Sequence, residues 1–127
     1  MFEFGYIRES GERRSQPAGR QQLKAVLQYV AEHYREKIRI ADLAGMSGFS
    51  ESYFMSFFKQ NVGMSCISYI NHYRVQRAAN ALEETTQPVM DIAMDNGFDN
   101  ISYFNLQFRR AFGMTPREFR TRQRRGE

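Results

Sequence analysis

The side chains best suited to nucleophilic or metal chemistry are scarce in this 127-residue chain, which has one cysteine, Cys66, and two histidines, His33 and His72. A zinc site needs several cysteine, histidine or carboxylate ligands at characteristic spacings, and no such spacing occurs. The sequence also lacks a glycine-rich phosphate loop and a nucleophile elbow. We therefore predict no enzymatic activity, no metal site and no cofactor.

Cys66 leaves one enzymatic alternative open, because a thiol at the start of a helix can have a lowered pKa and act as a nucleophile. A lone cysteine in such a place is more often packed in the core, and a pH series of alkylation rates separates the two readings. Cys66 has no partner for an internal disulfide, and neither a signal peptide nor an apolar run long enough to span a membrane is present. These features predict a cytoplasmic protein.

Arginine is abundant near the C-terminus. Residues 109–127 contain seven arginines and two glutamates, in a chain whose net charge is +4. A polyanion is the natural partner of such a basic surface. A solvated basic tail explains the charge equally well, so charge alone does not identify a partner.

Two segments of the chain, residues 43–65 and 92–115, repeat one another, with one extra residue in the second copy. The matched pairs are Ala44 and Ala93, Gly48 and Gly97, Phe49 and Phe98, Tyr53 and Tyr103, Phe54 and Phe104, Phe58 and Phe108, Lys59 and Arg109, Gly63 and Gly113, and Met64 and Met114. Two copies are too few for a solenoid. The sequence therefore predicts a pair of similar compact units.

Each copy has the pattern of a short helix, a tight turn and a second helix. A polar N-cap candidate precedes the second helix, Ser50 in the first copy and Asp99 or Asn100 in the second. Phenylalanines follow at helical spacing, and Gly63 or Gly113 ends the helix. Each copy is thus predicted to be a helix-turn-helix unit.

The segments around the two copies also predict helices. Residues 20–36 carry an amphipathic apolar stripe, and residues 66–84 form a long helix. Thr115-Pro116-Arg117-Glu118 is a capping box with proline at the first helical position, so a last helix begins there. The expected fold is all-α, with two helix-turn-helix subdomains joined by a long linking helix. The expected domains are residues 1–19 (linker or remnant of an upstream domain), 20–64 (first subdomain), 65–84 (linking helix) and 85–127 (second subdomain with a basic tail).

Arg74 falls on the apolar side of the long helix. We expect a semi-buried arginine paired to a carboxylate, with a structural role, because buried charges are usually paired. The apolar residues that define this side are Ile67, Ile70, Ala78, Ala81 and Leu82.

The second helix of each copy has an outer face opposite its phenylalanines, since an α-helix turns by about 100° per residue. Small polar and basic side chains on such a face can enter a major groove and touch base edges. Asn105 can read adenine bidentately, while Met55 and Leu106 can meet only apolar groups such as a thymine methyl. The predicted base-contacting residues are Ser52, Met55, Ser56, Ser102, Asn105, Leu106 and Arg109. The predicted phosphate-contacting residues are Arg39, Lys59, Arg110 and Arg117.

Two alternatives to DNA recognition remain at this stage. The outer faces can simply meet solvent, which suits serine and lysine but leaves Met55 and Leu106 without a reason to be exposed. The fold can also serve as a protein–protein interaction module that does not bind DNA. A titration against duplex DNA at two salt concentrations separates the module from a DNA-binding protein.

The second copy closely resembles the signature of the AraC/XylS family of transcriptional regulators, in Ile92-Ala93, Asn96-Gly97-Phe98, Ser102-Tyr103-Phe104, Phe108-Arg109, Phe112-Gly113-Met114-Thr115-Pro116 and Phe119-Arg120. Leu43-Ala44, Ser52-Tyr53-Phe54, Phe58-Lys59 and Gly63 resemble the family's first helix-turn-helix. The resemblance covers about residues 21–123. It implies seven homeodomain-like helices and two recognition helices in successive major grooves of double-stranded DNA, about 34 Å apart.

The resemblance also implies further partners and domains. Family members often contact RNA polymerase, and many carry this domain behind an effector-binding or dimerisation domain. The stray aromatics in residues 1–19 favour a fragment of a larger regulator over a stand-alone protein. Effector binding and dimerisation then belong to the missing domain, and we expect this region to bind no small molecule and no membrane.

The chain departs from the family at two base-facing positions. Relatives commonly have arginine where this chain has Ser56 and Leu106. The strongest guanine-reading side chain is therefore absent at both positions. We expect more weight on phosphate contacts, apolar thymine contacts and DNA shape.

Overall fold

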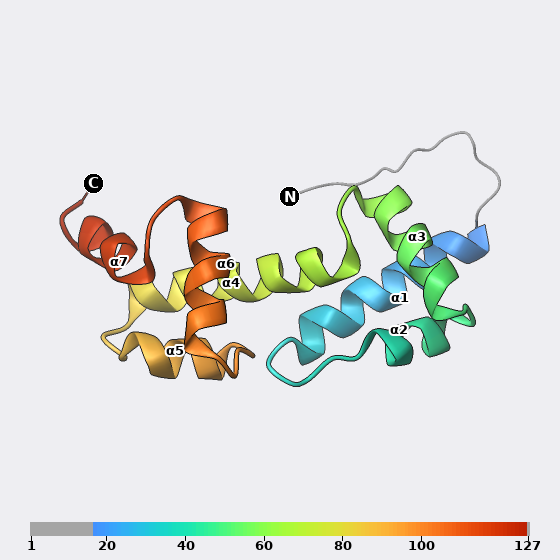
Figure 1. Ribbon diagram of the computed structural model, residues 1–127, viewed down its shortest axis with the longest axis horizontal. Coiled ribbons are helices and arrows are strands. Elements are labelled where there is room, and N and C mark those ends of the chain that lie inside the picture. Colours follow the sequence, from blue (N-terminus) through green and yellow to red (C-terminus); the bar gives the residue numbers. More distant parts are fainter. Residues whose placement is uncertain (1–16, 127) are drawn as a thin grey trace. The chain divides into compact units, whose positions relative to one another are not determined.

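The computed structural model describes residues 17–126, and over these residues the chain forms seven α-helices and no strand (Figure 1). In chain order the helices are α1 (Pro17–His33), α2 (Ile40–Ser47), α3 (Glu51–Val62), α4 (Cys66–Glu84), α5 (Val89–Asp95), α6 (Ile101–Phe112) and α7 (Pro116–Arg124). The prediction of an all-α fold is confirmed. The predicted linker or remnant at residues 1–19 lies outside the described residues, except for its last three residues, which begin α1.

The described residues form two compact units. The first unit consists of residues 17–33 and 38–69, and the second consists of residues 34–37 and 70–126. The division falls inside α4, whose first turn belongs to the first unit and whose remainder belongs to the second. The first four residues of the loop between α1 and α2, residues 34–37, belong to the second unit, although both of those helices belong to the first.

The first unit packs α1, α2 and α3 around an aromatic and aliphatic core. Val26 and Val30 of α1, Leu43 of α2, and Phe54 and Phe58 of α3 are all fully buried. These residues recur every three or four positions along their helices, which places them on one face of each helix. Removing these side chains from water is the main source of stability in a unit of this size.

The second unit is built in the same way around the phenylalanines of α6. Phe104 and Phe108 are fully buried and pack with Leu82 of α4, Ile92 of α5 and Phe119 of α7. Figure 1 shows α6 at a steep angle to α5, the arrangement expected of two helices joined by a tight turn. The core of each unit therefore holds the second helix of its repeat firmly by its aromatic face.

The helix ends agree with the predicted caps. The side chain of Ser50 accepts a hydrogen bond from the backbone N–H three residues later at 3.1 Å, and Asn100 does the same at 2.9 Å. Asn100, rather than Asp99, is thus the N-cap of α6. Gly63 and Gly113 end their helices with φ of +94° and +75°, a left-handed conformation that costs glycine little.

The capping box at the start of α7 is also confirmed. The Thr115 hydroxyl accepts from the backbone N–H of Glu118 at 3.1 Å, and the Glu118 carboxylate accepts from the backbone N–H of Thr115 at 2.9 Å. The hydrogen bond from the Thr115 backbone lowers the pKa of Glu118. The box fixes where α7 begins, and with it the position of Arg117 in the first turn.

Two arginines of the predicted basic tail have a structural partner. Arg120 donates to the carbonyl oxygens of Leu82 and Thr85, both at 3.2 Å, and Arg124 donates to that of Thr85 at 2.8 Å. These carbonyls lie at the C-terminal end of α4, where backbone acceptors lack partners within the helix and cations are favoured. The C-terminal arginines are therefore not a uniform DNA-facing surface.

Arg74 is half-buried as predicted, but the expected carboxylate partner is wrong. Its guanidinium donates instead to two backbone carbonyl oxygens, those of Tyr34 at 2.7 Å and Glu36 at 2.8 Å. Burial lowers the pKa of Arg74, and the charge of nearby Asp99 acts in the opposite direction. Ile67, predicted on the same apolar side of α4, is 49% exposed, because the buried residues of that first turn are Cys66, Tyr69 and Ile70.

Candidate nucleic-acid interface

Helix α3 carries the candidate residues of the first unit on the face opposite its core. Because Phe54 and Phe58 point into the core, the helical period turns Ser52, Ser56 and Lys59 outward, and all three are exposed. Met55 is only partly exposed. The structure thus brings three of the four predicted residues of α3 together on an open helix face.

Helix α6 carries the candidate residues of the second unit in the same way. Ser102, Asn105 and Arg109 are exposed on the face away from Phe104 and Phe108. Leu106 stands on this face with 47% of its surface exposed. All four predicted residues of α6 are therefore available to a partner.

The two helix faces use matched positions of the repeat but differ in chemistry. At matched positions Met55 corresponds to Asn105, Ser56 to Leu106, and Lys59 to Arg109. Leu106 is 47% exposed, whereas Met55, the apolar candidate of α3, is only partly exposed. The argument that an exposed hydrophobic side chain needs a partner therefore holds more for α6 than for α3. The faces are thus suited to different contacts.

The predicted phosphate-contacting residues are all exposed. Arg39 lies at the N-cap of α2, where its side chain makes no capping hydrogen bond, and Lys59 lies in the last turn of α3. Arg110 and Arg117 belong to α6 and α7 of the second unit. Side chains of this length and charge can reach phosphate oxygens beside a recognition helix.

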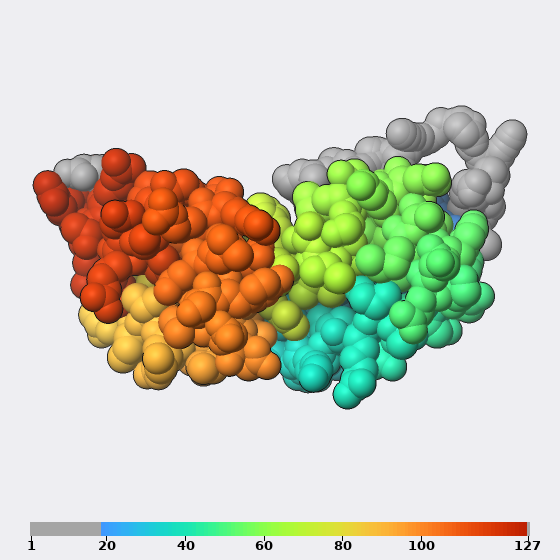
Figure 2. Space-filling model, in the orientation of Figure 1, coloured from blue at the N-terminus to red at the C-terminus, as the bar shows by residue number. Residues whose placement is uncertain are grey.

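The second unit offers the more positive surface around its recognition helix. Figure 2 shows α6 and α7 as a continuous exposed surface, coloured orange to red. Over residues 101–126 there are seven arginines and a single acidic residue, Glu118. Helix α6 has no acidic residue in its first turn and carries Arg109 and Arg110 in its last turn. In the first unit, by contrast, Lys59 shares α3 with Glu51.

Two exposed tyrosines lie beside the candidate serines, and their exposure was not predicted from the sequence. Tyr53 is 57% exposed and Tyr103 is 42% exposed, one near the start of each recognition helix. The hydroxyl of Tyr103 accepts a hydrogen bond from Asn71 of α4 at 2.7 Å. The available signal was the helical period, because each tyrosine precedes a core phenylalanine by one position and therefore points about 100° away from it.

Cys66 has the environment of a core residue. It is fully buried, and burial raises the pKa of its thiol to about 12. A nucleophilic cysteine needs a lowered pKa and access to solvent. The structure therefore gives no support to the alternative in which Cys66 is catalytic.

The remaining candidates for chemistry are isolated from one another. His33 stacks on Tyr29 with 4.2 Å between ring centroids, and His72 is exposed on α4. Over residues 17–126 no three histidine, cysteine or acidic side chains gather as a metal ion would require. None of the helices in that range is long and apolar enough to cross a membrane.

Comparison with known proteins identifies relatives of this arrangement. A family model described as a helix-turn-helix domain matches residues 43–122. The regulatory protein SoxS of Salmonella typhimurium is 32% identical over 100 residues, which cover 79% of this chain and 94% of SoxS. The F1 operon positive regulatory protein of Yersinia pestis is 35% identical over 99 residues, covering 77% of this chain and 33% of that protein. The chain spans about a third of the length of most of the curated relatives it matches, SoxS excepted.

Solved structures share the fold. The DNA-binding domain of AdpA, a global transcriptional factor solved in complex with a target DNA, superimposes with a TM-score of 0.76 at 27% identity, covering 84% of this chain and 97% of that one. An AraC-type transcriptional regulator from Chromobacterium violaceum gives 0.74 at 25% identity, with coverages of 85% and 96%. Both likenesses extend over both units of the chain.

Proposed function

This chain belongs to the AraC/XylS-type helix-turn-helix family of DNA-binding transcriptional regulators, and we propose that it binds double-stranded DNA sequence-specifically by inserting α3 and α6 into successive major grooves. The observation that carries the proposal is the matched pair of rigid helices, each held by a buried aromatic face and each presenting an open polar face. A recognition helix of this kind fits the width of the major groove.

The side chains divide into two roles. Ser52, Ser56, Ser102, Asn105 and Arg109 can form hydrogen bonds to base edges, and Met55 and Leu106 can contact thymine methyl groups. Arg39, Lys59, Arg110 and Arg117 neutralise phosphates and set the register of the protein on the duplex. The structure of the AdpA DNA-binding domain in complex with a target DNA supports these roles, because that domain has the same fold.

This chain is proposed to be the DNA-binding part of a larger regulator that acts in the cytoplasm. In several curated relatives the matched segment makes up only about a third of the protein, which favours an additional effector-binding or dimerisation domain. Contact with RNA polymerase, which the family resemblance implies, is proposed as a second interaction. Both stay predictions for the full-length protein.

Salt dependence of binding tests the proposal against the protein-interaction alternative. With four phosphate contacts, affinity for duplex DNA should fall about 150-fold between roughly 50 and 200 mM salt, because each neutralised phosphate releases condensed counterions. Fluorescence anisotropy with a random-sequence duplex measures this. Absence of binding at the lower salt concentration would support the protein-interaction module instead.

Two matched variants sharpen the salt experiment. Lys59→Ala removes a predicted phosphate contact on α3 and should reduce the slope of log affinity against log salt by about 0.9. Lys24→Ala removes the same charge from an exposed position on α1 and should leave the slope unchanged. Equal slopes for the two variants would remove Lys59 from the interface.

Base preference provides a separate prediction, because Ser56 and Leu106 replace side chains that would read guanine. Binding-site selection from a random pool should recover sites with no fixed guanine opposite either position, since serine and leucine lack the bidentate donors of arginine. Recovered sites that demand a guanine opposite each position would contradict the assigned roles.

A further inference from the structure

The first four residues of the loop between α1 and α2, Tyr34–Lys37, are here called the strap. The strap belongs to the second unit, while the helices before and after it belong to the first. The backbone therefore passes from one unit to the other three times, after His33, after Lys37 and after Tyr69. Only the last of these crossings is the linking helix α4; the other two are the ends of the strap.

Arg74 fastens the strap by its backbone. Its Nε donates to the carbonyl oxygen of Tyr34 at 2.7 Å, and a terminal nitrogen donates to that of Glu36 at 2.8 Å. Arginine suits this task because its planar guanidinium presents several donors in fixed directions. Two carbonyls two residues apart are thus held by one half-buried side chain of α4.

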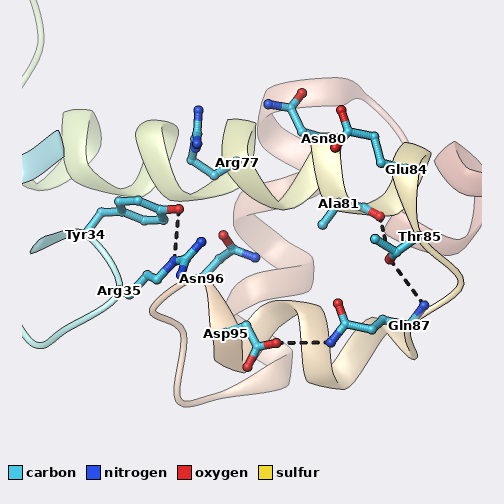
Figure 3. A pocket seen from close by; sticks show the side chains of 10 residues that line it. All are labelled: Tyr34, Arg35, Arg77, Asn80, Ala81, Glu84, Thr85, Gln87, Asp95 and Asn96. Carbon is cyan, nitrogen blue, oxygen red and sulfur yellow. Dashed lines mark hydrogen bonds between the residues drawn. The ribbon is translucent and has the colours of Figure 1, made fainter. Parts of the chain in front are cut away.

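The side chain of Tyr34 adds a second attachment. Tyr34 is buried, and its ring lies 5.3 Å from that of Tyr73 of α4. The guanidinium of Arg77, one turn further along α4, lies 5.8 Å from the centre of the Tyr34 ring. Figure 3 shows Tyr34 and Arg35 of the strap at one side of a polar pocket that Arg77 and Asn96 also line.

Gly97 lies beside the contact between Arg74 and the strap, and the repeat supplies a control for its role. A Cβ atom at Gly97 would lie 2.4 Å from the carbonyl oxygen of Tyr34 and 2.6 Å from Nε of Arg74. The matched Gly48 has a similar positive φ, +76° against +99°, but a Cβ there would meet nothing within 4 Å. The first unit needs this glycine for its backbone conformation alone, whereas the second unit also needs it to leave room for the strap.

We propose that Arg74 and Gly97 are positioning residues that lock the strap to the second unit, so that two fastened connections rather than α4 alone restrain the units relative to each other. A second tether narrows the range of arrangements that two linked bodies can sample. The consequence for DNA, which rests on the proposed function, is that the locked strap sets the half-site spacing the protein accepts.

The distance between the units tests the strap without DNA. Spin labels at Lys24→Cys in α1 and Met90→Cys in α5, both exposed positions, report the distribution of inter-unit distances by pulsed electron resonance; the buried Cys66 stays unlabelled. Arg74→Ala and Gly97→Ala should each broaden this distribution, and Gly48→Ala should not. Circular dichroism checks that each variant is folded.

The conservative variant keeps the experiment decisive if Arg74→Ala unfolds the second unit. Arg74→Lys retains the charge and can reach one carbonyl but not both, so it should fold and give an intermediate width. If the distance distributions of Arg74→Lys and Gly97→Ala are as narrow as that of the parent protein, the proposal that the strap restrains the units is wrong. Equal broadening in Gly48→Ala and Gly97→Ala would also contradict it.

The DNA arm measures affinity for paired half-sites whose separation changes in steps of one base pair. The parent protein should prefer one separation by at least about tenfold, and Arg74→Ala should lose that preference. A broadened distance distribution with an unchanged spacing preference would overturn the claim about spacing. If the parent protein fails to bind any duplex, the proposed function is wrong. The distance measurement still tests whether the strap restrains the two units.

Discussion

Phe108→Ala should unfold the second unit, at a cost of about 3–5 kcal/mol. Phe108 is fully buried, and its ring centroid lies within 5.7 Å of the rings of Phe104, Phe112 and Phe119. Replacing it by alanine removes contacts with α6 and α7 together and leaves a cavity between them. Small domains are stable by only about 5–15 kcal/mol in total, so one half of such a chain is not expected to survive the loss.

Chemical denaturation followed by amide NMR measures the effect separately for each unit. Signals from α5, α6 and α7 should collapse in Phe108→Ala, while those of α1 to α3 persist. Phe112→Ala is the matched control, because Phe112 lies on the same helix but is only partly buried, and its loss should cost less. A Phe108→Ala protein that keeps native signals in both units would show that the Phe108 ring is not essential to the core.

Asn105→Ala should alter which base is preferred at one position of the binding site. The side-chain amide can donate to and accept from adenine at once, and losing it should cost about 1–3 kcal/mol at the preferred site. Asn105 is exposed on α6, so its removal should leave the fold intact. Competition binding with single-base variants of a selected site measures the change.

Arg110→Ala is the control for this base-reading role. Arg110 is exposed in the last turn of α6, and a phosphate contact there should contribute alike to every sequence. The variant should therefore weaken selected and random duplexes by similar factors. If Asn105→Ala also lowers both affinities equally, Asn105 contacts the backbone and not a base.

The helices and their ends could be predicted because local sequence determines them. Ser50 and Asn100 are short polar side chains that cap a helix, and Thr115 with Glu118 forms a capping box whose partners lie three residues apart. Gly63 and Gly113 adopt positive φ, which few other residues tolerate. Features that depend on neighbours along the chain are thus accessible from the sequence alone.

The partners of the half-buried arginines Arg74 and Arg120 could not be predicted, because they are backbone atoms. Arg74 donates to the carbonyl oxygens of residues 40 and 38 positions earlier in the chain. Arg120 likewise donates to carbonyl oxygens at the end of α4, 38 and 35 positions earlier. Every residue has a carbonyl group, so no side-chain pattern marks the ones that will be used. Only the tertiary fold selects them.

The candidate interface lies between these two cases. The helical period correctly places Ser52, Ser56, Asn105 and Leu106 on open faces. It does not say how wide each face is, because that depends on which neighbouring side chains cover its edges. Met55 is consequently less exposed than expected, and the exposure of both tyrosines of the repeat was missed.

The single cysteine gives a chain of two similar halves a natural means of telling them apart. Cys66 belongs to the first unit, where it is fully shielded and carries almost no thiolate at neutral pH, since its pKa is about 12. The second unit contains no cysteine at all. The rate at which an alkylating reagent modifies Cys66 therefore reports the opening of the first unit only. The native chain needs no added label for this measurement.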